Sequence, residues 1–101
     1  MTDEPDFGFA PPPFKPAEAL QRAQRELREM GLAERAGTFE RAGVAIARLV
    51  VDGSTLQAAI VKRPSRLSPE WQRKTISSSA QLRDFTADLK RKLAGWGDRD
   101  D

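Results

Sequence analysis

Apolar side chains recur with helical spacing in the first part of the chain. They are three or four residues apart and comprise Leu20, Ala23, Leu27 and Met30. This spacing places them on one face of an α-helix. Pro16 is suited to the first turn of such a helix, and Gly31 to the position just after its end. The pattern predicts an amphipathic helix over residues 17–30.

A second helical pattern lies near the C-terminal end of the sequence. Its apolar residues are Leu82, Phe85, Leu89, Leu93 and Trp96. Ser78 and Gln81 have the spacing of a capping box, in which the two side chains satisfy backbone N–H groups at a helix start. The pattern predicts a long helix over residues 78–94 that buries its apolar face.

Apolar and polar residues alternate in the segment between these helices, as they do in a β-hairpin. Asp52-Gly53 separates two runs of β-branched and other apolar residues, and this dipeptide favours a type I′ turn with positive φ at both central residues. We expect strands near residues 43–51 and 54–62. The expected cross-strand pairs are Leu49 with Leu56, Ala47 with Ala58, and Ala45 with Ile60. One face of the hairpin is then fully apolar and faces the helices.

The other face of this hairpin mixes apolar and polar side chains. It carries the residues expected at an interface with a second copy, which are Val44, Ile46, Arg48, Val50 and Val61. A hairpin by itself is marginally stable and has two unpaired edges, so we expect something to cover it. The candidates are the N-terminal arm, a foreign partner, and a second copy pairing strand to strand into a four-stranded sheet. Twofold dimers are the commonest oligomers, which favours a homodimer.

The stretch KRPSRLSPEW, residues 62–71, joins the hairpin to the long helix. Pro64 ends the second strand, and Ser68-Pro69-Glu70 has the residue types of a helix start. We therefore expect a short helix of one or two turns from Pro69. Trp71 in its first turn is then expected to cover the core or to contact a partner.

These elements define an α+β fold with the order helix, β-hairpin, short helix, long helix (αββα). Residues 1–16 hold five of the seven prolines and three of the five phenylalanines. Such a segment favours a disordered, extended Pro/Phe-rich arm. Residues 97–101 form an acidic tail that we expect to fray. A chain of 101 residues has the length of one domain, which we place at residues 17–96.

The composition narrows the chemistry available to the chain. It contains no His, Cys or Tyr, so the usual general base, thiol nucleophiles and nitrogen or sulfur metal ligands are missing. We expect no enzymatic activity, cofactor, metal or small-molecule substrate. The apolar runs are too short to span a membrane, and the N-terminus has no basic segment leading into an apolar one. We therefore expect a cytoplasmic protein, with the Arg- and Ala-rich usage of a GC-rich bacterial or phage genome.

Positive charge is concentrated late in the chain. Between Lys62 and Lys92 there are nine Lys and Arg residues and three acidic residues, a net +6 in a chain whose formal net charge is +2. Such a surface suits an acidic protein partner. The candidate contact residues are Lys62, Arg63, Arg66, Trp71, Arg73, Lys74, Arg83 and Lys90. The sequence therefore predicts a non-catalytic interaction module. The alternative is a nucleic-acid-binding accessory protein that uses the same cations, although no helix-turn-helix, RNA-binding sheet signature or zinc module is present.

Overall fold

The computed structural model describes residues 13–98 of the chain. The described elements are α1 (Pro16–Glu29), β1 (Ala33–Arg35), β2 (Thr38–Arg41), β3 (Val44–Asp52), β4 (Thr55–Val61), β5 (Trp71–Ile76) and α2 (Ser79–Asp98). Most of the expected N-terminal arm, residues 1–12, and the end of the expected tail, residues 99–101, lie outside the described residues. The helix α2 continues through Gly95 to Asp98, so it is longer than the spacing of its apolar residues predicted.

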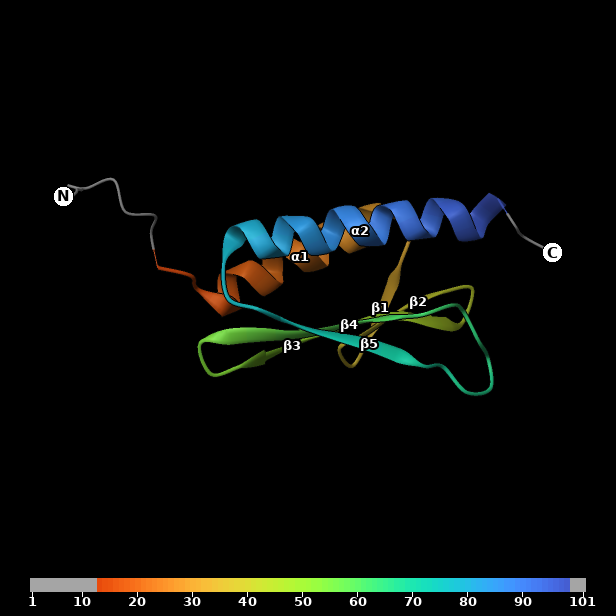
Figure 1. Ribbon diagram of the computed structural model, residues 1–101, viewed down its shortest axis with the longest axis horizontal. Helices are drawn as coiled ribbons and strands as arrows, with labels where there is room; N and C mark the ends of the chain where they lie inside the picture. Colours follow the sequence, from red (N-terminus) through yellow and green to blue (C-terminus); the bar gives the residue numbers. More distant parts are fainter. Residues whose placement is uncertain (1–12, 99–101) are drawn as a thin grey trace.

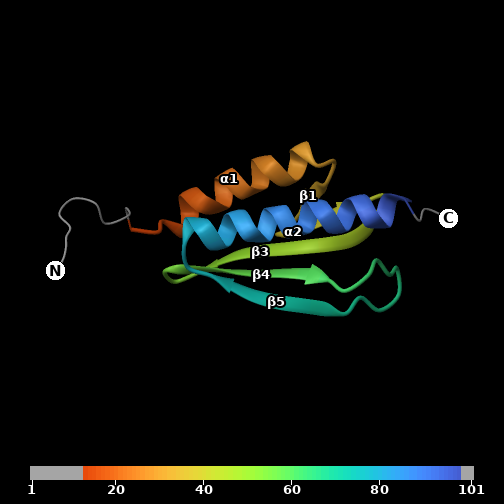
Figure 2. The same ribbon diagram turned by 45° about the horizontal axis from the view of Figure 1, so that its top comes forward.

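The five strands form one antiparallel sheet in the order β1-β2-β3-β4-β5, so every strand pairs with its neighbours in the sequence. Both helices pack side by side on one face of this sheet (Figures 1 and 2). No element within residues 13–98 covers the opposite face. The predicted α+β class is confirmed. The predicted αββα order is incomplete, because three further strands extend the hairpin on both sides.

The core fills the space between the helices and the sheet. Ala19, Ala23 and Leu27 of α1 are buried, as are Leu82, Phe85, Leu89 and Leu93 of α2. They pack against sheet residues that include Phe39, Ile46, Ala47, Leu49, Leu56, Ala58, Ile60 and Ile76. The backbone N–H of Gln81 donates to the Ser78 hydroxyl oxygen at 3.1 Å, which is one half of the predicted capping box. The Gln81 side-chain oxygen accepts from the backbone N–H of Ser77 at 2.7 Å and not from that of Ser78.

Two of the additional strands depend on a repeated tetrapeptide. Glu-Arg-Ala-Gly occurs at residues 34–37 and 40–43, and each copy ends in a two-residue turn. The turn residues Ala36, Gly37, Ala42 and Gly43 have φ of 52°, 84°, 56° and 80°. Positive φ at both central residues is what a type I′ hairpin turn requires. Alanine rarely adopts this conformation, which is why the sequence did not suggest β1 and β2 as strands.

The strained alanines give a stability prediction. Ala42→Gly is expected to raise the free energy of unfolding by about 1 kcal/mol, because glycine adopts positive φ without a Cβ clash. Urea unfolding of the purified chain measures this change. Ala45→Gly, in the extended strand β3, is the matched control and should lower stability by about 0.5–1 kcal/mol. Equal effects of the two substitutions would contradict the turn assignment.

The β3–β4 hairpin has a register two residues away from the predicted one. Leu49 pairs with Ala58, and Asp52 pairs with Thr55, so the two turn residues are Gly53 and Ser54. Gly53 has φ of 62°, and Ser54 does not have positive φ, which fits a type II′ turn. Because a shift of two residues keeps every side chain on the same face, the predicted apolar face is retained at Ala47, Leu49, Leu56, Ala58 and Ile60.

The expected short helix from Pro69 is wrong. Trp71–Ile76 instead forms β5 and pairs with β4 over its whole length, from Val61 with Trp71 to Leu56 with Ile76. Local helix-start residues are a weak preference, and pairing with the otherwise open edge of β4 overrides it. The hairpin is therefore not isolated: β2 and β5 of the same chain occupy both of its edges.

A β-bulge changes which side chains of β3 face the helices. Phe39 pairs with Ala47 and Glu40 pairs with Ala45, so Ile46 is an extra residue opposite β2. Ile46 and Ala47 are consecutive, yet both are buried, with exposed fractions of 1% and 0%. Ile46 therefore belongs to the core and not to the uncovered face on which the simple alternation had placed it.

Candidate functional site

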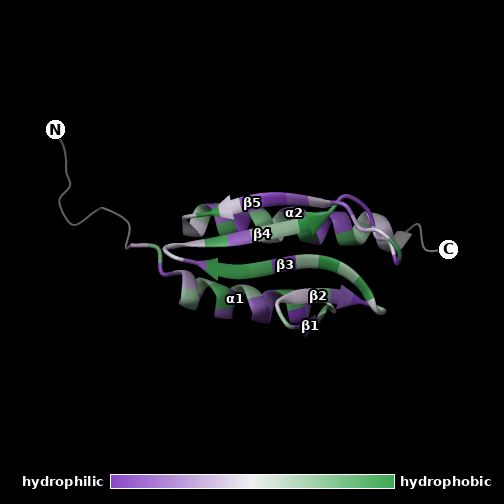
Figure 3. Cartoon of the chain, turned by 90° about the horizontal axis from the view of Figure 1, so that it is seen from below, coloured by the Kyte–Doolittle hydropathy of each residue, from purple (hydrophilic) through white to green (hydrophobic). Residues whose placement is uncertain are grey.

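The uncovered face of the sheet carries most of the residues of interest on β3, β4 and β5. By strand alternation and register, its side chains on these three strands include Arg48, Val50, Gln57, Ala59, Val61, Trp71, Arg73 and Thr75. Figure 3 shows this face from below, with hydrophobic residues along much of β3 and hydrophilic residues along much of β5. The face is therefore amphipathic rather than fully solvated.

Trp71 and Arg48 contact each other on this face, near the end of β4. The Arg48 guanidinium lies 5.3 Å from the centre of the Trp71 ring, a cation–π contact. Val61, the cross-strand neighbour of Trp71, is only 1% exposed. The contact joins β3 to β5 across β4.

Two arginines flank a small residue in one row across three strands. Arg48 pairs with Ala59, and Ala59 pairs with Arg73. The two arginine Cα atoms are thus separated by two strand spacings, roughly 10 Å. Because the side chain of Ala59 is only a methyl group, it leaves a shallow gap between the two long arginine side chains. We call Arg48, Ala59 and Arg73 the arginine row.

Within residues 13–98, no acidic side chain forms an ion pair with either arginine of the arginine row. The ion pairs within residues 13–98 join Lys15 to Glu18, Arg28 to Glu34, Lys62 to Glu70, and both Arg91 and Lys92 to Asp88. None of these pairs includes Arg48 or Arg73. The row therefore presents two guanidinium groups that can bind carboxylate or phosphate oxygens in a bidentate manner.

The loop from Lys62 to Glu70 places further cations at one end of the sheet. It is folded around the Ser65 hydroxyl oxygen, which accepts hydrogen bonds from the backbone N–H groups of Leu67 at 3.3 Å and Ser68 at 3.1 Å. Lys62 forms an ion pair with Glu70 at 4.0 Å. The loop therefore has a defined local structure.

This loop borders an open cleft of about 680 Å³ beside the end of α2. The charged residues that line the cleft are Arg41, Lys62, Arg63 and Arg66, and Trp96 lies among them. The Arg41 guanidinium donates to the Leu93 carbonyl oxygen at 3.4 Å. This bond connects β2 to α2, so Arg41 has a structural role within the cluster.

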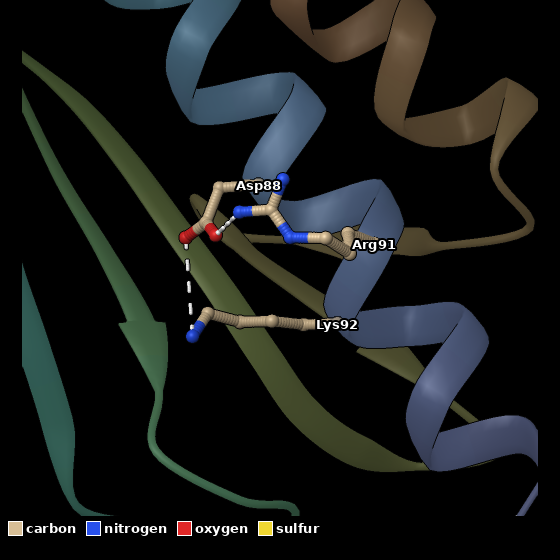
Figure 4. A network of polar contacts seen from close by, with 3 residues as sticks. All are labelled: Asp88, Arg91 and Lys92. Atoms are coloured by element: carbon tan, nitrogen blue, oxygen red, sulfur yellow. Dashed lines mark hydrogen bonds and ion pairs between the residues drawn. The ribbon is translucent and has the colours of Figure 1, made fainter.

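The other predicted contact residues lie on the helical side of the molecule. Lys74 pairs with Ala58, whose side chain faces the helices. Arg83 and Lys90 line a groove of about 770 Å³ whose other charged residues are Glu26, Glu29 and Arg41. Figure 4 shows the Asp88 carboxylate in contact with both Arg91 and Lys92, and its distance to the Lys92 ammonium is 3.9 Å. The net +6 of this segment is thus divided between two faces and partly compensated.

The residues expected at a dimer interface are also divided. Val50, with 52% exposure, and Arg48 are accessible on the uncovered face, whereas Ile46 and Val61 are each 1% exposed. Val44 is half-buried and lines the cleft beside the loop. Strand-to-strand pairing of β3 or β4 with a second copy would require loss of β2 or β5. The homodimer itself stays a prediction.

Sequence reasoning missed the parts of these sites that depend on strand pairing. Ala59 was not singled out, although it separates the two arginines. Arg41 and Trp96 were not grouped with the loop, because they are far from it in the sequence. A correct hairpin register would have placed Arg48 beside Ala59. Placing Arg73 beside Ala59 also requires that residues 71–76 be recognised as the strand β5.

Comparisons with known protein families, with curated proteins and with solved structures found no match for this chain. Neither helix of residues 13–98 combines the length and apolar character needed to cross a membrane. Across the same residues, no group of three or more His, Cys, Asp or Glu side chains is placed to hold a metal ion.

Proposed function

We propose that this protein is a non-catalytic interaction module that docks an acidic protein surface onto the uncovered face of its sheet. The observation that carries the proposal is the arginine row: two arginines that form no ion pair within residues 13–98 flank Ala59, and one of them makes a cation–π contact with Trp71. Aromatic and arginine side chains are typical of the residues that contribute most to protein interfaces.

The distribution of charge favours a protein partner over nucleic acid. A nucleic-acid strand is bound along a continuous cationic track that follows its phosphates. Here Arg83 and Lys90 lie on the helical side, in a groove that also contains Glu26 and Glu29. Among the strand residues that lie on the uncovered face, Trp71 is the aromatic one. A local acidic patch matches the two arginines and the adjoining apolar area better than a long polyanion does.

A second copy of the chain is a poorer fit to this face. Two copies meeting face to face would bring the arginine rows together, and like charges in an interface are unfavourable. Sedimentation velocity tests the homodimer that the hairpin pattern suggested. If the dimer forms through this face, Val50→Glu will convert it to a monomer. A mass that is unchanged by this substitution would remove the face from any dimer contact.

The proposal is tested by affinity capture from extracts of the native host, with and without nuclease treatment. The variant Arg48→Glu/Arg73→Glu reverses both charges of the arginine row, and Arg83→Glu/Lys90→Glu is the matched control on the helical side. We expect the control to retain the partner captured by the unchanged chain. The arginine-row variant should bind that partner about tenfold more weakly or worse, because acidic groups then meet like charges. Titration of the purified partner measures both affinities.

Two outcomes of this experiment would overturn the proposal. If both variants lose the partner equally, binding depends on total charge and not on the arginine row. If capture disappears on nuclease treatment, the binding is to nucleic acid, and its affinity should then fall steeply as the salt concentration rises.

A further inference from the structure

The strand β5 forms one edge of the sheet. It pairs with β4 along all six of its residues, and no strand within residues 13–98 pairs with its other side. The opposite edge of the sheet is formed by β1, which has only three residues. An edge strand presents unpaired N–H and C=O groups that another extended segment can bind. Of the two edges, β5 offers the longer regular template.

One hydrogen bond shows which backbone groups of β5 face outward. The Lys62 N–H donates to the Glu70 carbonyl oxygen at 2.9 Å, so these opposed residues form a hydrogen-bonded pair. In an antiparallel ladder such pairs alternate with non-hydrogen-bonded ones. The register of β4 and β5 then makes Trp71, Arg73 and Thr75 the non-hydrogen-bonded residues. Their N–H and C=O groups point toward the free edge.

The outward groups therefore belong to the same residues whose side chains lie on the uncovered face. A strand added at this edge would bond to Trp71, Arg73 and Thr75 through its backbone. Its side chains on that face would lie next to Arg73, at one end of the arginine row. The edge and the arginine row thus form one continuous surface.

The positive charges of β5 favour an acidic segment as the strand that pairs with its free edge. Arg73 and Lys74 are exposed at the centre of the strand, which contains no acidic residue. In a twofold antiparallel pairing of β5 with its own copy, these cations would face each other, and like charges opposite one another destabilise a sheet. An added strand with acidic residues at two successive positions would instead place one carboxylate near each cation.

A cleft along the edge supplies a site for an apolar side chain. It has a volume of about 270 Å³ and lies on the helical side of β5. Its lining includes Ile60 and Phe85, with Lys74 and Asp88 also in the wall. Because successive side chains of a strand alternate between faces, a segment with an acidic residue near Lys74 can direct a neighbouring apolar residue on the same face into this cleft.

We propose that β5 binds an extended, acidic segment of the protein partner by strand addition along its free edge. This inference rests on the proposed function and specifies how the partner binds. The backbone of the segment bonds to Trp71, Arg73 and Thr75, its carboxylates lie near Arg73 and Lys74, and an apolar side chain enters the cleft beside Phe85. Backbone pairing supplies affinity in this mode, and the alternating side chains supply specificity.

Amide hydrogen exchange tests the backbone geometry. In the free chain, the amides of Gln72, Lys74 and Ile76 should exchange slowly, and those of Arg73 and Thr75 should exchange rapidly. In the complex, Arg73 and Thr75 should become protected. If their exchange is unchanged when the partner segment is bound, the strand addition is wrong.

Peptide selection followed by substitution tests the proposal directly. Displayed random peptides are selected on the full chain, and the enriched sequence is synthesised and titrated by fluorescence anisotropy. We expect extended, proline-free sequences with adjacent acidic residues. Thr75→Pro removes one outward N–H group and should weaken binding about tenfold, which corresponds to the loss of one strand hydrogen bond and its neighbours. Proline is tolerated at edge positions whose N–H faces solvent.

The matched control is Thr75→Val, which keeps the N–H group. It removes only the exposed hydroxyl that donates to the Gln57 side-chain oxygen at 3.2 Å, so binding should change less than about twofold. Acidic peptides that bind the proline variant as well as the unchanged chain, yet fail to bind Arg48→Glu/Arg73→Glu, would overturn strand addition and leave the proposed function standing. Enriched peptides without acidic residues would count against both proposals.

Discussion

Truncation of Phe39 to alanine should lower the free energy of unfolding by about 3–5 kcal/mol, the usual cost of removing a fully buried aromatic ring. Phe39 is 0% exposed and is among the largest fully buried side chains within residues 13–98. It lies on β2 and packs into the core shared by the helices and the sheet. Since small domains are stable by only about 5–15 kcal/mol, the variant should be partly unfolded near physiological temperature.

Urea unfolding monitored by circular dichroism measures this loss, and Phe14→Ala is the matched control. Phe14 precedes α1 and packs against the core while remaining partly exposed. Its truncation should cost about 1 kcal/mol, because less apolar area is removed from contact. Similar losses for the two variants would show that β2 is not an integral part of the sheet.

Glutamate in place of Ile46 should be at least as damaging, with a loss of about 4 kcal/mol or more. The substitution removes a buried branched side chain and puts a carboxylate in its place, at a position that is 1% exposed. The bulge opposite β2 is the reason that this side chain faces the helices. The variant is expected to express as an unfolded or aggregated chain.

Val50→Glu is the control that connects the predicted loss of stability to the bulge. Val50 is 52% exposed on the uncovered face, so a glutamate there should change stability by about 0.5 kcal/mol or less. Without the bulge, Ile46 and Val50 would lie on the same face and the two substitutions would have similar effects. Thermal unfolding of both variants distinguishes these cases.

The two tests also separate stability from binding. Val50, Arg48 and Arg73 belong to the uncovered face and contribute little to the core between the sheet and the helices. Substitutions at these positions are therefore suitable for binding experiments on a folded chain. Ile46 and Val61 are not suitable, although the hairpin pattern suggested them as interface residues, because their burial makes any polar replacement destabilising.

Amino-acid periodicity determined the elements whose signals are local. The repeat of apolar residues every three or four positions predicted α1 and α2, because one turn of a helix brings such residues onto one face. The two runs around Asp52-Gly53 predicted β3 and β4 and the face that β4 buries, whereas on β3 the predicted face is wrong at Ile46. The hairpin register was two residues off, since Gly53-Ser54 also forms an allowed turn, and a two-residue shift leaves the apolar pattern unchanged.

Only the tertiary structure determined the remaining strands and the grouping of the cations. β1 and β2 depend on alanines with positive φ, and β5 begins after residues that locally favour a helix. Their pairing is favoured because it satisfies the open edges of β3 and β4, a contribution that no local pattern contains. The bulge at Ile46 likewise exists only in relation to β2. Arg48 and Arg73 are 25 positions apart in the sequence and become neighbours of Ala59 because three strands pair, so the candidate site is a product of the sheet and not of any single segment.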